Sequence, residues 1–106
     1  MSKTEWKSGT FIYPIPAVMV SCGDMEDSNI LTVAWTGILN TNPAKVYISV
    51  RPERFSYEII KSTGEFAINL TTAKLAFATD WCGVKSGAKV DKFKEMNLTK
   101  EKLNHI

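Results

Sequence analysis

The hydrophobic pattern of the first half of the chain predicts β-strands separated by short polar turns. An apolar run rich in valine occupies residues 17–22, and a second apolar run follows soon after it. The polar connector at residues 25–28 is short enough for residues 29–34 to pair with the first run as an antiparallel strand. A turn at residues 40–43 then leads into a further strand at residues 45–50, in which apolar and polar positions alternate.

The second apolar run continues to Leu39 with only weak alternation between apolar and polar residues. Weak alternation is typical of a strand that is covered on both faces or bent at a glycine. The run is therefore interpreted as one strand over residues 30–39. Gly37 is predicted to be a β-bulge or a point where another part of the backbone or a side chain comes close.

The period of the pattern changes to that of a helix at Pro52. Proline is favoured at the first helical position, and an acidic residue follows it. Phe55, Ile59 and Ile60 lie on one apolar stripe. Gly64 occupies the position at which helices commonly end. A helix is therefore predicted from Pro52 to the residue before Gly64.

The second half of the chain predicts one more strand and one more helix. Residues 65–70 alternate as a strand does, and residues 73–82 follow with helical spacing. Thr72 is predicted to cap this helix and Gly83 to end it. Asp91 is predicted to cap a short helical turn, after which the pattern fades.

These elements follow the order βββαβα in a single domain spanning residues 1–106. Neighbouring strands can all pair antiparallel, which disfavours a doubly wound parallel sheet. No Gly-x-Gly-x-x-Gly segment follows a strand, so the common dinucleotide-binding fingerprint is missing. The predicted fold is mainly β, a small β-barrel or β-sandwich with flanking helices.

Composition and charge narrow the classes of function. A net charge of +2 with scattered lysines predicts no nucleic-acid partner, and no apolar run is long enough to predict a membrane span. Cys22 and Cys82 are predicted to be reduced, small buried hydrophobes of a cytoplasmic protein. One histidine, His105, lies in a polar tail, so no metal site is predicted.

Polar and cationic side chains gather where the third strand passes into the first helix. Ser49, Arg51, Arg54, Ser56 and Tyr57 fall within nine residues. Guanidinium groups, hydroxyls and the free N–H groups of a helix start are what an anionic group such as a phosphate needs. The plainer alternative, a helix start with an ordinary surface charge, stays open.

Four segments of the chain together resemble the flavin reductase family, and more narrowly its flavoredoxin branch. They are Asn-Ile-Leu-Thr-Val-Ala-Trp at residues 29–35, Ser-Val-Arg-Pro-Glu-Arg-Phe-Ser-Tyr at 49–57, Thr-Gly-Glu-Phe at 63–66, and Asp-Trp-Cys-Gly, Ser-Gly and Asp-Lys-Phe within 80–93. The resemblance covers residues 11–96. It implies a split β-barrel that binds flavin mononucleotide (FMN).

The resemblance also implies which residues contact the cofactor. Asn29 would contact the flavin, and the backbone of Ala34, Trp35 and Thr36 would line the ring edge with Trp35 packed beside it. The ribityl and phosphate end would be held by a second set of residues, Ser49, Val50, Arg51, Ser56, Tyr57 and Lys92. Taken alone, Trp35 also fits a core residue, Asn29 a strand start, and Lys92 an exposed lysine.

The activity implied by the resemblance is hydride transfer from NADH or NADPH to the flavin, or passage of electrons through it. That chemistry belongs to the cofactor, so no catalytic side chain is predicted. Family members continue beyond the length of this chain with further barrel strands. The chain is therefore expected to be a truncated, incomplete barrel that covers its apolar interior by forming a homodimer, with strand exchange as one route.

Two other functions stay open. One is a non-catalytic fragment that acts only in self-assembly or in binding another chain. The other is binding of a different phosphorylated ring, because Arg51 and Ser56 cannot distinguish FMN from a nucleotide.

Overall fold

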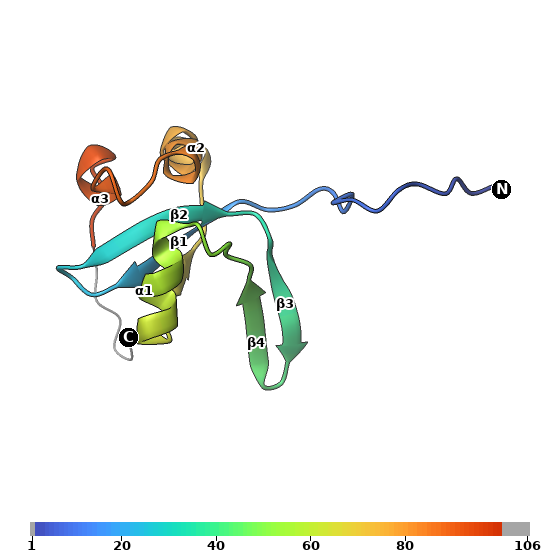
Figure 1. Ribbon diagram of the computed structural model, residues 1–106, viewed down its shortest axis with the longest axis horizontal. Helices are drawn as coiled ribbons and strands as arrows, with labels where there is room; N and C mark the ends of the chain where they lie inside the picture. Colours follow the sequence, from blue (N-terminus) through green and yellow to red (C-terminus); the bar gives the residue numbers. More distant parts are fainter. Residues whose placement is uncertain (1, 101–106) are drawn as a thin grey trace.

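The strands form two separate antiparallel sheets in the computed structural model, which describes residues 2–100 (Figure 1). In the first sheet β1 (Val18–Gly23) lies between β2 (Ser28–Val33) and β5 (Ala67–Asn69). The second sheet is a hairpin of β3 (Thr36–Thr41) and β4 (Ala44–Ile48) that projects from the body. The fold is thus mainly β with flanking helices. Within the described residues the two sheets do not close on each other, so the barrel is incomplete.

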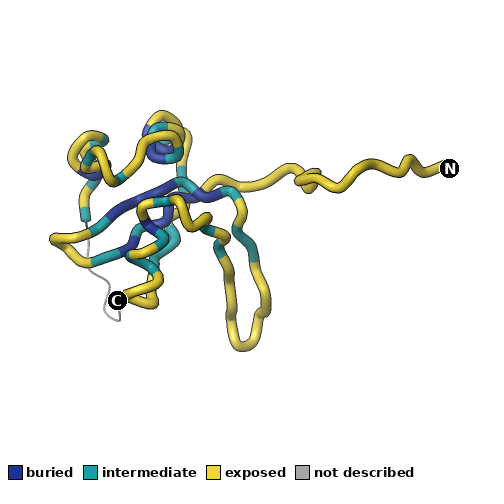
Figure 2. The backbone as a smooth tube through the Cα atoms, in the orientation of Figure 1, coloured by how far each residue is buried: buried dark blue, intermediate teal, exposed yellow. Residues whose placement is uncertain are grey.

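The three-stranded sheet has an apolar core on each face, because alternate residues of β1 and β2 point to opposite sides. Val18 and Val20 pack with Leu31 and Val33 on one face. Met19 and Ile30 pack on the other face with Cys82 and Phe93 from the helical region. The buried residues follow β1, β2 and the helices that cover them, whereas the hairpin is exposed along most of its length (Figure 2).

Helices flank the three-stranded sheet. The helix α1 (Phe55–Thr63) packs against β1 and β2 on one side. The helices α2 (Ala76–Val84) and α3 (Lys92–Glu95) lie on the other side (Figure 1). A short 3₁₀ turn, η1 (Ala73–Leu75), leads directly into α2. The strand β2 is thus contacted from both sides, which places the ends of α1, α2 and α3 around it.

The predicted antiparallel pairing of the first two strands is confirmed, with Val20 opposite Leu31. The prediction of a single strand over residues 30–39 is wrong, because this run forms β2 and β3, which belong to different sheets. The chain turns at Ala34, whose carbonyl accepts a hydrogen bond from the Thr36 N–H, 3.1 Å away. Five strands therefore lie in the described part of the chain, where four were predicted.

The prediction that Gly37 is a point of close approach is confirmed. A Cβ atom at Gly37 would lie 2.8 Å from a ring atom of Tyr47, its partner on β4, so any larger residue would have to displace the Tyr47 ring. The register of the hairpin shifts between Ile38 and Asn40, just after this contact. The bulge thus follows the glycine.

The first helix begins later than predicted. Its first residue is Phe55, because the chain from Arg51 to Arg54 forms a turn in which the Arg54 N–H donates to the Arg51 carbonyl, 3.0 Å away. The predicted end is confirmed, since Gly64 adopts a left-handed conformation with φ 74°. Pro52 lies in the preceding turn, and its restricted φ favours the turn conformation.

The second predicted helix exists, with different boundaries. Thr72 precedes η1, but its side chain accepts no hydrogen bond from the helix, so the predicted cap is wrong. Gly83 does not end α2, which continues to Val84. Gly83 instead faces Thr32 of β2, where a Cβ atom would lie 3.3 Å from the threonine side chain. Glycine is therefore used there for close packing between helix and strand.

Two structural properties bear on the class of protein. Among residues 2–100, no helix is both long and apolar enough to cross a membrane. In the same part of the chain, no three His, Cys, Asp or Glu side chains are grouped so that they could hold a metal ion. His105 lies outside the described residues.

Candidate functional site

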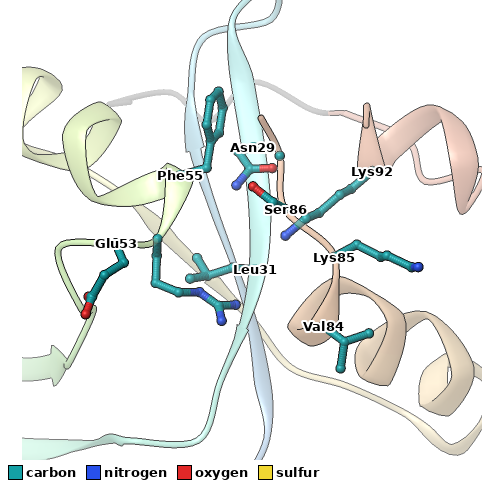
Figure 3. Close-up of a pocket in the computed structure, with 10 residues that line it drawn as sticks. Asn29, Leu31, Glu53, Phe55, Val84, Lys85, Ser86 and Lys92 are labelled. Atoms are coloured by element: carbon teal, nitrogen blue, oxygen red, sulfur yellow. The ribbon is translucent and has the colours of Figure 1, made fainter. Parts of the chain in front are cut away.

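A cavity of about 170 Å³ lies beside β2, between the start of α1 and the segment that connects α2 to α3 (Figure 3). Its wall combines cationic, polar and apolar side chains. They are Asn29, Leu31, Glu53, Arg54, Phe55, Val84, Lys85, Ser86, Gly87 and Lys92. We call it the first cavity.

A second cavity, of about 150 Å³, lies further along β2, towards the point where the chain leaves the sheet for the hairpin. It is lined by the last residues of β2, the turn after it, and the segment that follows β4. These are Leu31, Thr32, Val33, Ala34, Trp35, Ser49, Val50, Arg51 and Arg54. Leu31 and Arg54 line both cavities, so the two are neighbouring parts of one groove.

Arg54 is held at the junction of the two cavities by both its backbone and its side chain. Its backbone forms the N-cap position of α1. Its guanidinium Nη2 donates a hydrogen bond to the carbonyl of Gly83 in the last turn of α2, 3.2 Å away. A cation near the carbonyls at a helix C-terminus is favoured by the helix dipole. The side chain therefore joins α1 to α2 across the groove and remains beside both cavities.

Lys92 brings a second cation to the first cavity. The residue is only 2 % exposed, and its Nζ donates to the carbonyl of Cys82, 2.8 Å away. The predicted cap of its helix is confirmed, because the Asp91 carboxylate accepts from the N–H groups of Phe93 and Lys94. This cap fixes the start of α3 and so directs Lys92 towards the groove. The interpretation of Lys92 as an ordinary exposed lysine is therefore wrong.

The environment of Lys92 lowers the pKa of its amine to about 8. Burial is the largest cause, because an ammonium loses hydration there, and the nearby Arg54 cation lowers the pKa further. Cys82 and Cys22 act in the opposite direction only in their ionised, thiolate form. Burial in turn raises the pKa of both thiols, so they stay protonated at neutral pH.

Asn29 and Ser56 form the floor of the first cavity. The Asn29 Nδ2 donates to Ser56 Oγ, 2.8 Å away, and both side chains are buried. Gly87 comes so close that a Cβ atom there would collide with the Asn29 amide and would lie 2.7 Å from the Phe55 ring. The start of α1, the start of β2 and the loop after α2 are thus held together at this end of the groove.

The groove collects most of the residues predicted for the site, in two sets. Ala34, Trp35, Ser49, Val50 and Arg51 line the second cavity, whereas Asn29 and Lys92 line the first. Ser56 lies beneath Asn29 and is fully buried.

Two of the predicted residues lie outside both cavities, and Arg51 and Trp35, which line the second cavity, are exposed to solvent. Thr36 and Tyr57 line neither cavity, and the Thr36 hydroxyl donates to the Tyr47 carbonyl. Arg51 pairs with Glu53 at 3.1 Å on the exposed rim. Trp35 is 49 % exposed, so its interpretation as a core residue is wrong.

Several cavity residues were not among the predicted site residues. In the first cavity they are Leu31, Glu53, Arg54, Phe55, Val84, Lys85, Ser86 and Gly87. A signal for Arg54 was present in the cluster of polar residues before the first helix, and Ser86 and Gly87 belong to one of the resemblance motifs. Nothing in the local sequence shows that the loop after α2 folds back against Asn29.

The two cavities differ in chemistry. Arg54 and Lys92 give the first cavity two buried or half-buried cations, whereas the carboxylate of Glu53 and the amine of Lys85 point away from Lys92 (Figure 3). Such a site suits an anion. The second cavity offers Val33, Val50 and the Trp35 ring, which suit a flat apolar group. Each cavity is smaller than the roughly 300 Å³ at the low end for small-molecule sites. A ligand with an apolar ring and an anionic end would fill both.

Comparisons with known proteins place this chain in a family. The model of the flavin reductase like domain matches residues 10–105. Two relatives are uncharacterized proteins of Archaeoglobus fulgidus, 28% identical over 89 residues, and of Pyrococcus abyssi, 26% identical over 88 residues. These matches cover 84% and 83% of this chain and 50% of each relative, so the chain spans about half the length of the curated relatives it matches.

Solved structures have the same fold. Flavoredoxin of Desulfovibrio vulgaris (Miyazaki F) superposes with a TM-score of 0.88 at 29% identity, over 99% of this chain and 58% of that one. Flavoredoxin from Methanosarcina acetivorans gives 0.78 at 29% identity, over 87% and 50%. An FMN-binding protein from Thermus thermophilus gives 0.78 at 21% identity, over 89% and 55%, which shows the fold alone. The chain thus has an incomplete split-barrel fold, and it belongs to the family of the flavin reductase like domain.

Proposed function

We propose that this chain binds FMN in the groove beside β2 and takes part in flavin reduction or electron transfer linked to NADH or NADPH. The observation that carries the proposal is the pairing of a cationic cavity with an apolar one across Arg54. FMN has the matching shape, a flat ring joined through a polyol to a phosphate. The family of the flavin reductase like domain and the flavoredoxins of similar fold support a flavin as the cofactor.

The residues present fit the cofactor in a specific orientation. We assign the phosphate to the first cavity, where Arg54 and Lys92 provide charge-assisted donors and Ser86 a hydroxyl. We assign the ring to the second cavity, beside Ala34, Trp35 and Val50. This places the phosphate closer to Arg54 than to Arg51, whose guanidinium is already paired with Glu53 on the exposed rim.

When bound, the flavin would accept a hydride or pass on electrons, and that chemistry is its own. The chain contributes binding and electrostatics. Arg54 and Lys92 would balance the phosphate charge, and the apolar wall of the second cavity would keep water from one face of the ring. We assign no general acid, base or nucleophile. Cys22 and Cys82 are buried thiols, consistent with a reducing, cytoplasmic setting.

We further propose that the chain forms a homodimer through its hairpin. A two-stranded hairpin on its own is marginally stable in water, and three of its apolar side chains, Ile38, Leu39 and Val46, are more than half exposed. This surface is also the observation that favours the second candidate function, a non-catalytic module that acts only in assembly. Exchange of the hairpin strands between two chains is one way to form such a dimer.

The cofactor proposal is tested by titrating the purified protein with FMN and with riboflavin, which has the same ring and no phosphate. The protein should bind FMN, show flavin absorbance, and release FMN on denaturation. Arg54→Gln should weaken FMN by roughly tenfold to a hundredfold, as expected for loss of a charge-assisted hydrogen bond, and riboflavin much less.

Arg51→Gln is the matched comparison, because it removes the neighbouring guanidinium from the rim. Its effect on FMN should be smaller than that of Arg54→Gln. A larger effect of Arg51→Gln, or equal losses for FMN and riboflavin in Arg54→Gln, would contradict the assigned orientation. A protein that stays colourless and ignores added FMN would favour the assembly module.

A further inference from the structure

Lys92 has an unusual environment for a side chain that would bind a phosphate. Its amine is almost fully buried, and its one hydrogen bond to the described part of the chain goes to the Cys82 carbonyl. It also lines the first cavity, towards which it points from the start of α3 (Figure 3). An ammonium has three N–H donors and no acceptor. The amine therefore keeps donors for a ligand in the cavity.

The charged groups around this amine come from four parts of the fold. Cys22 of β1 and Cys82 of α2 face it as thiols whose pKa is raised by burial. Arg54, just before α1, faces it as a permanent cation. Glu53 and Lys85 line the same cavity with their charged ends directed away from it (Figure 3). On α3 itself, the Asp91 carboxylate is occupied by the backbone cap. No anion among the described residues thus compensates Lys92 directly.

We propose, on the premise that the first cavity holds the FMN phosphate, that Lys92 takes up a proton as the phosphate enters. The affinity for FMN then falls as the pH rises through the alkaline range, whereas the affinity for riboflavin does not. The chain would thereby release or retain its phosphorylated cofactor according to pH. This inference adds regulation to the proposed site and rests on that proposal.

The sign follows from the charges. In the free protein the pKa of Lys92 is lowered to about 8 by burial, so a growing share of the amines is neutral above that pH. The phosphate of FMN is a dianion above pH ~7, because its second pKa is about 6. A nearby dianion favours the ammonium and raises the pKa of Lys92 in the complex. The complex therefore holds more protons than its free components, and binding weakens as protons become scarce.

The size of the effect has a clear limit. A single coupled proton changes the dissociation constant by at most tenfold per pH unit, since a difference of one pKa unit corresponds to ~1.36 kcal/mol. The affinity for FMN should change little near pH 7, where the phosphate is already a dianion, and fall by up to about tenfold per unit between pH ~8 and ~9.5. Cys22 and Cys82 remain thiols over most of this interval, because burial raises their pKa.

Isothermal titration calorimetry tests this directly. FMN and riboflavin are titrated into the whole chain at pH 7.0, 8.0 and 9.0, each in two buffers with different ionisation enthalpies. The difference between buffers counts the protons taken up. For FMN the count should rise from near zero at pH 7.0 towards one at pH 9.0, and for riboflavin it should stay near zero. This measurement needs no variant, so it does not depend on whether a substitution folds.

Two substitutions and one control sharpen the test. Lys92→Arg keeps a permanent cation and should bind FMN with an affinity that no longer depends on pH. Lys92→Met has no charge and should bind FMN at least tenfold more weakly at pH 7 with the same flat profile. Lys94→Met, an exposed neighbour on α3, should behave like the unaltered chain.

The outcomes separate the two proposals. FMN binding at pH 7 with no proton uptake at pH 9.0 would overturn the role of Lys92 and leave FMN binding intact. A pH dependence shared by FMN and riboflavin would also overturn it, because the phosphate would then not be the cause. Absence of FMN binding at any pH would remove both proposals together.

Discussion

The side-chain amide of Asn29 donates a hydrogen bond to the hydroxyl of Ser56, and both residues are almost completely removed from solvent. Asn29 belongs to β2 and Ser56 to the first turn of α1, so this bond joins the sheet to the helix under the floor of the first cavity. Arg54 and Phe55, which line that cavity, directly precede Ser56. The position of the cavity wall therefore depends on this buried contact.

Replacing Ser56 with alanine should destabilise the protein. The substitution leaves the buried Asn29 amide without its partner, and an unsatisfied buried polar group costs ~1–3 kcal/mol. The free energy of unfolding, measured by urea denaturation, should fall by that amount. Ser62→Ala is the matched control on the exposed side of α1, and it should change stability by less than ~0.5 kcal/mol. Equal losses from the two substitutions would show that the Asn29–Ser56 bond has no special role.

A methyl group at Gly87 should disturb the first cavity. A Cβ atom there would overlap the Asn29 amide and come within 2.7 Å of the Phe55 ring, so both must move. In Gly87→Ala we expect FMN affinity to fall by roughly tenfold or more, since such displacements of a binding wall are costly. Fluorescence titration measures this loss. Ala88→Gly, at the next and exposed position, should leave the affinity within about twofold, and a comparable loss there would mean that loop flexibility is the cause.

The buried Lys92 should also make stability depend on pH. Its folded pKa of about 8 lies below the ~10.4 of an unfolded chain, so between these values the unfolded state binds more protons. Stability conferred through this group therefore rises with pH from about 8 to 10. The raised pKa values of Cys22 and Cys82 act in the opposite sense, since unfolded thiols ionise first. The measured dependence of the unfolding free energy on pH therefore combines the effects of the lysine and of the two cysteines.

A comparison with Lys92→Met isolates the lysine. Between pH ~7.5 and ~10, the free energy of unfolding of the unaltered chain should increase relative to that of Lys92→Met by on the order of 2 kcal/mol. Urea denaturation at each pH measures both proteins under identical conditions. A difference that is constant across this range would mean that the buried amine has an ordinary pKa.

Local pattern was sufficient for much of the fold, because local chemistry decides those elements. The valine-rich run of β1, the left-handed Gly64 and the capping Asp91 are each determined by residues within a few positions. The break between β2 and β3 was not predictable in this way. Its residues form a continuous apolar run, and Trp35 there accepts a hydrogen bond from the N–H of Ser49, 14 positions away.

The same distinction holds for the candidate site. The charge cluster before α1 was visible in the sequence, but which arginine faces the groove was not. Arg51 and Arg54 have the same chemistry, and only the placement of α1 and α2 on the two sides of β2 brings Arg54 to Gly83 and leaves Arg51 on the rim. The burial of Lys92 likewise depends on how α3 packs, because the local sequence, a lysine beside an aspartate, predicts an exposed side chain.

The hairpin should mediate self-association. Ile38 and Val46 are cross-strand partners, so their side chains lie together on one face of the hairpin, and both are more than half exposed. Such exposed apolar pairs on a two-stranded sheet are favourable sites for contact with a second copy. Sedimentation velocity at micromolar concentration should show a dimer. Replacing both Ile38 and Val46 with lysine should convert it to a monomer, because like charges would face each other across the contact.

Asn40→Lys is the matched control, because it adds a positive charge to an exposed position of the same hairpin without removing an apolar side chain. It should leave the dimer largely intact. A strictly monomeric unaltered chain at micromolar concentration would exclude the proposed dimer. If the lysine pair stays dimeric while circular dichroism shows an unchanged fold, the contact must lie elsewhere on the molecule, and the exposed hairpin face would then need another explanation.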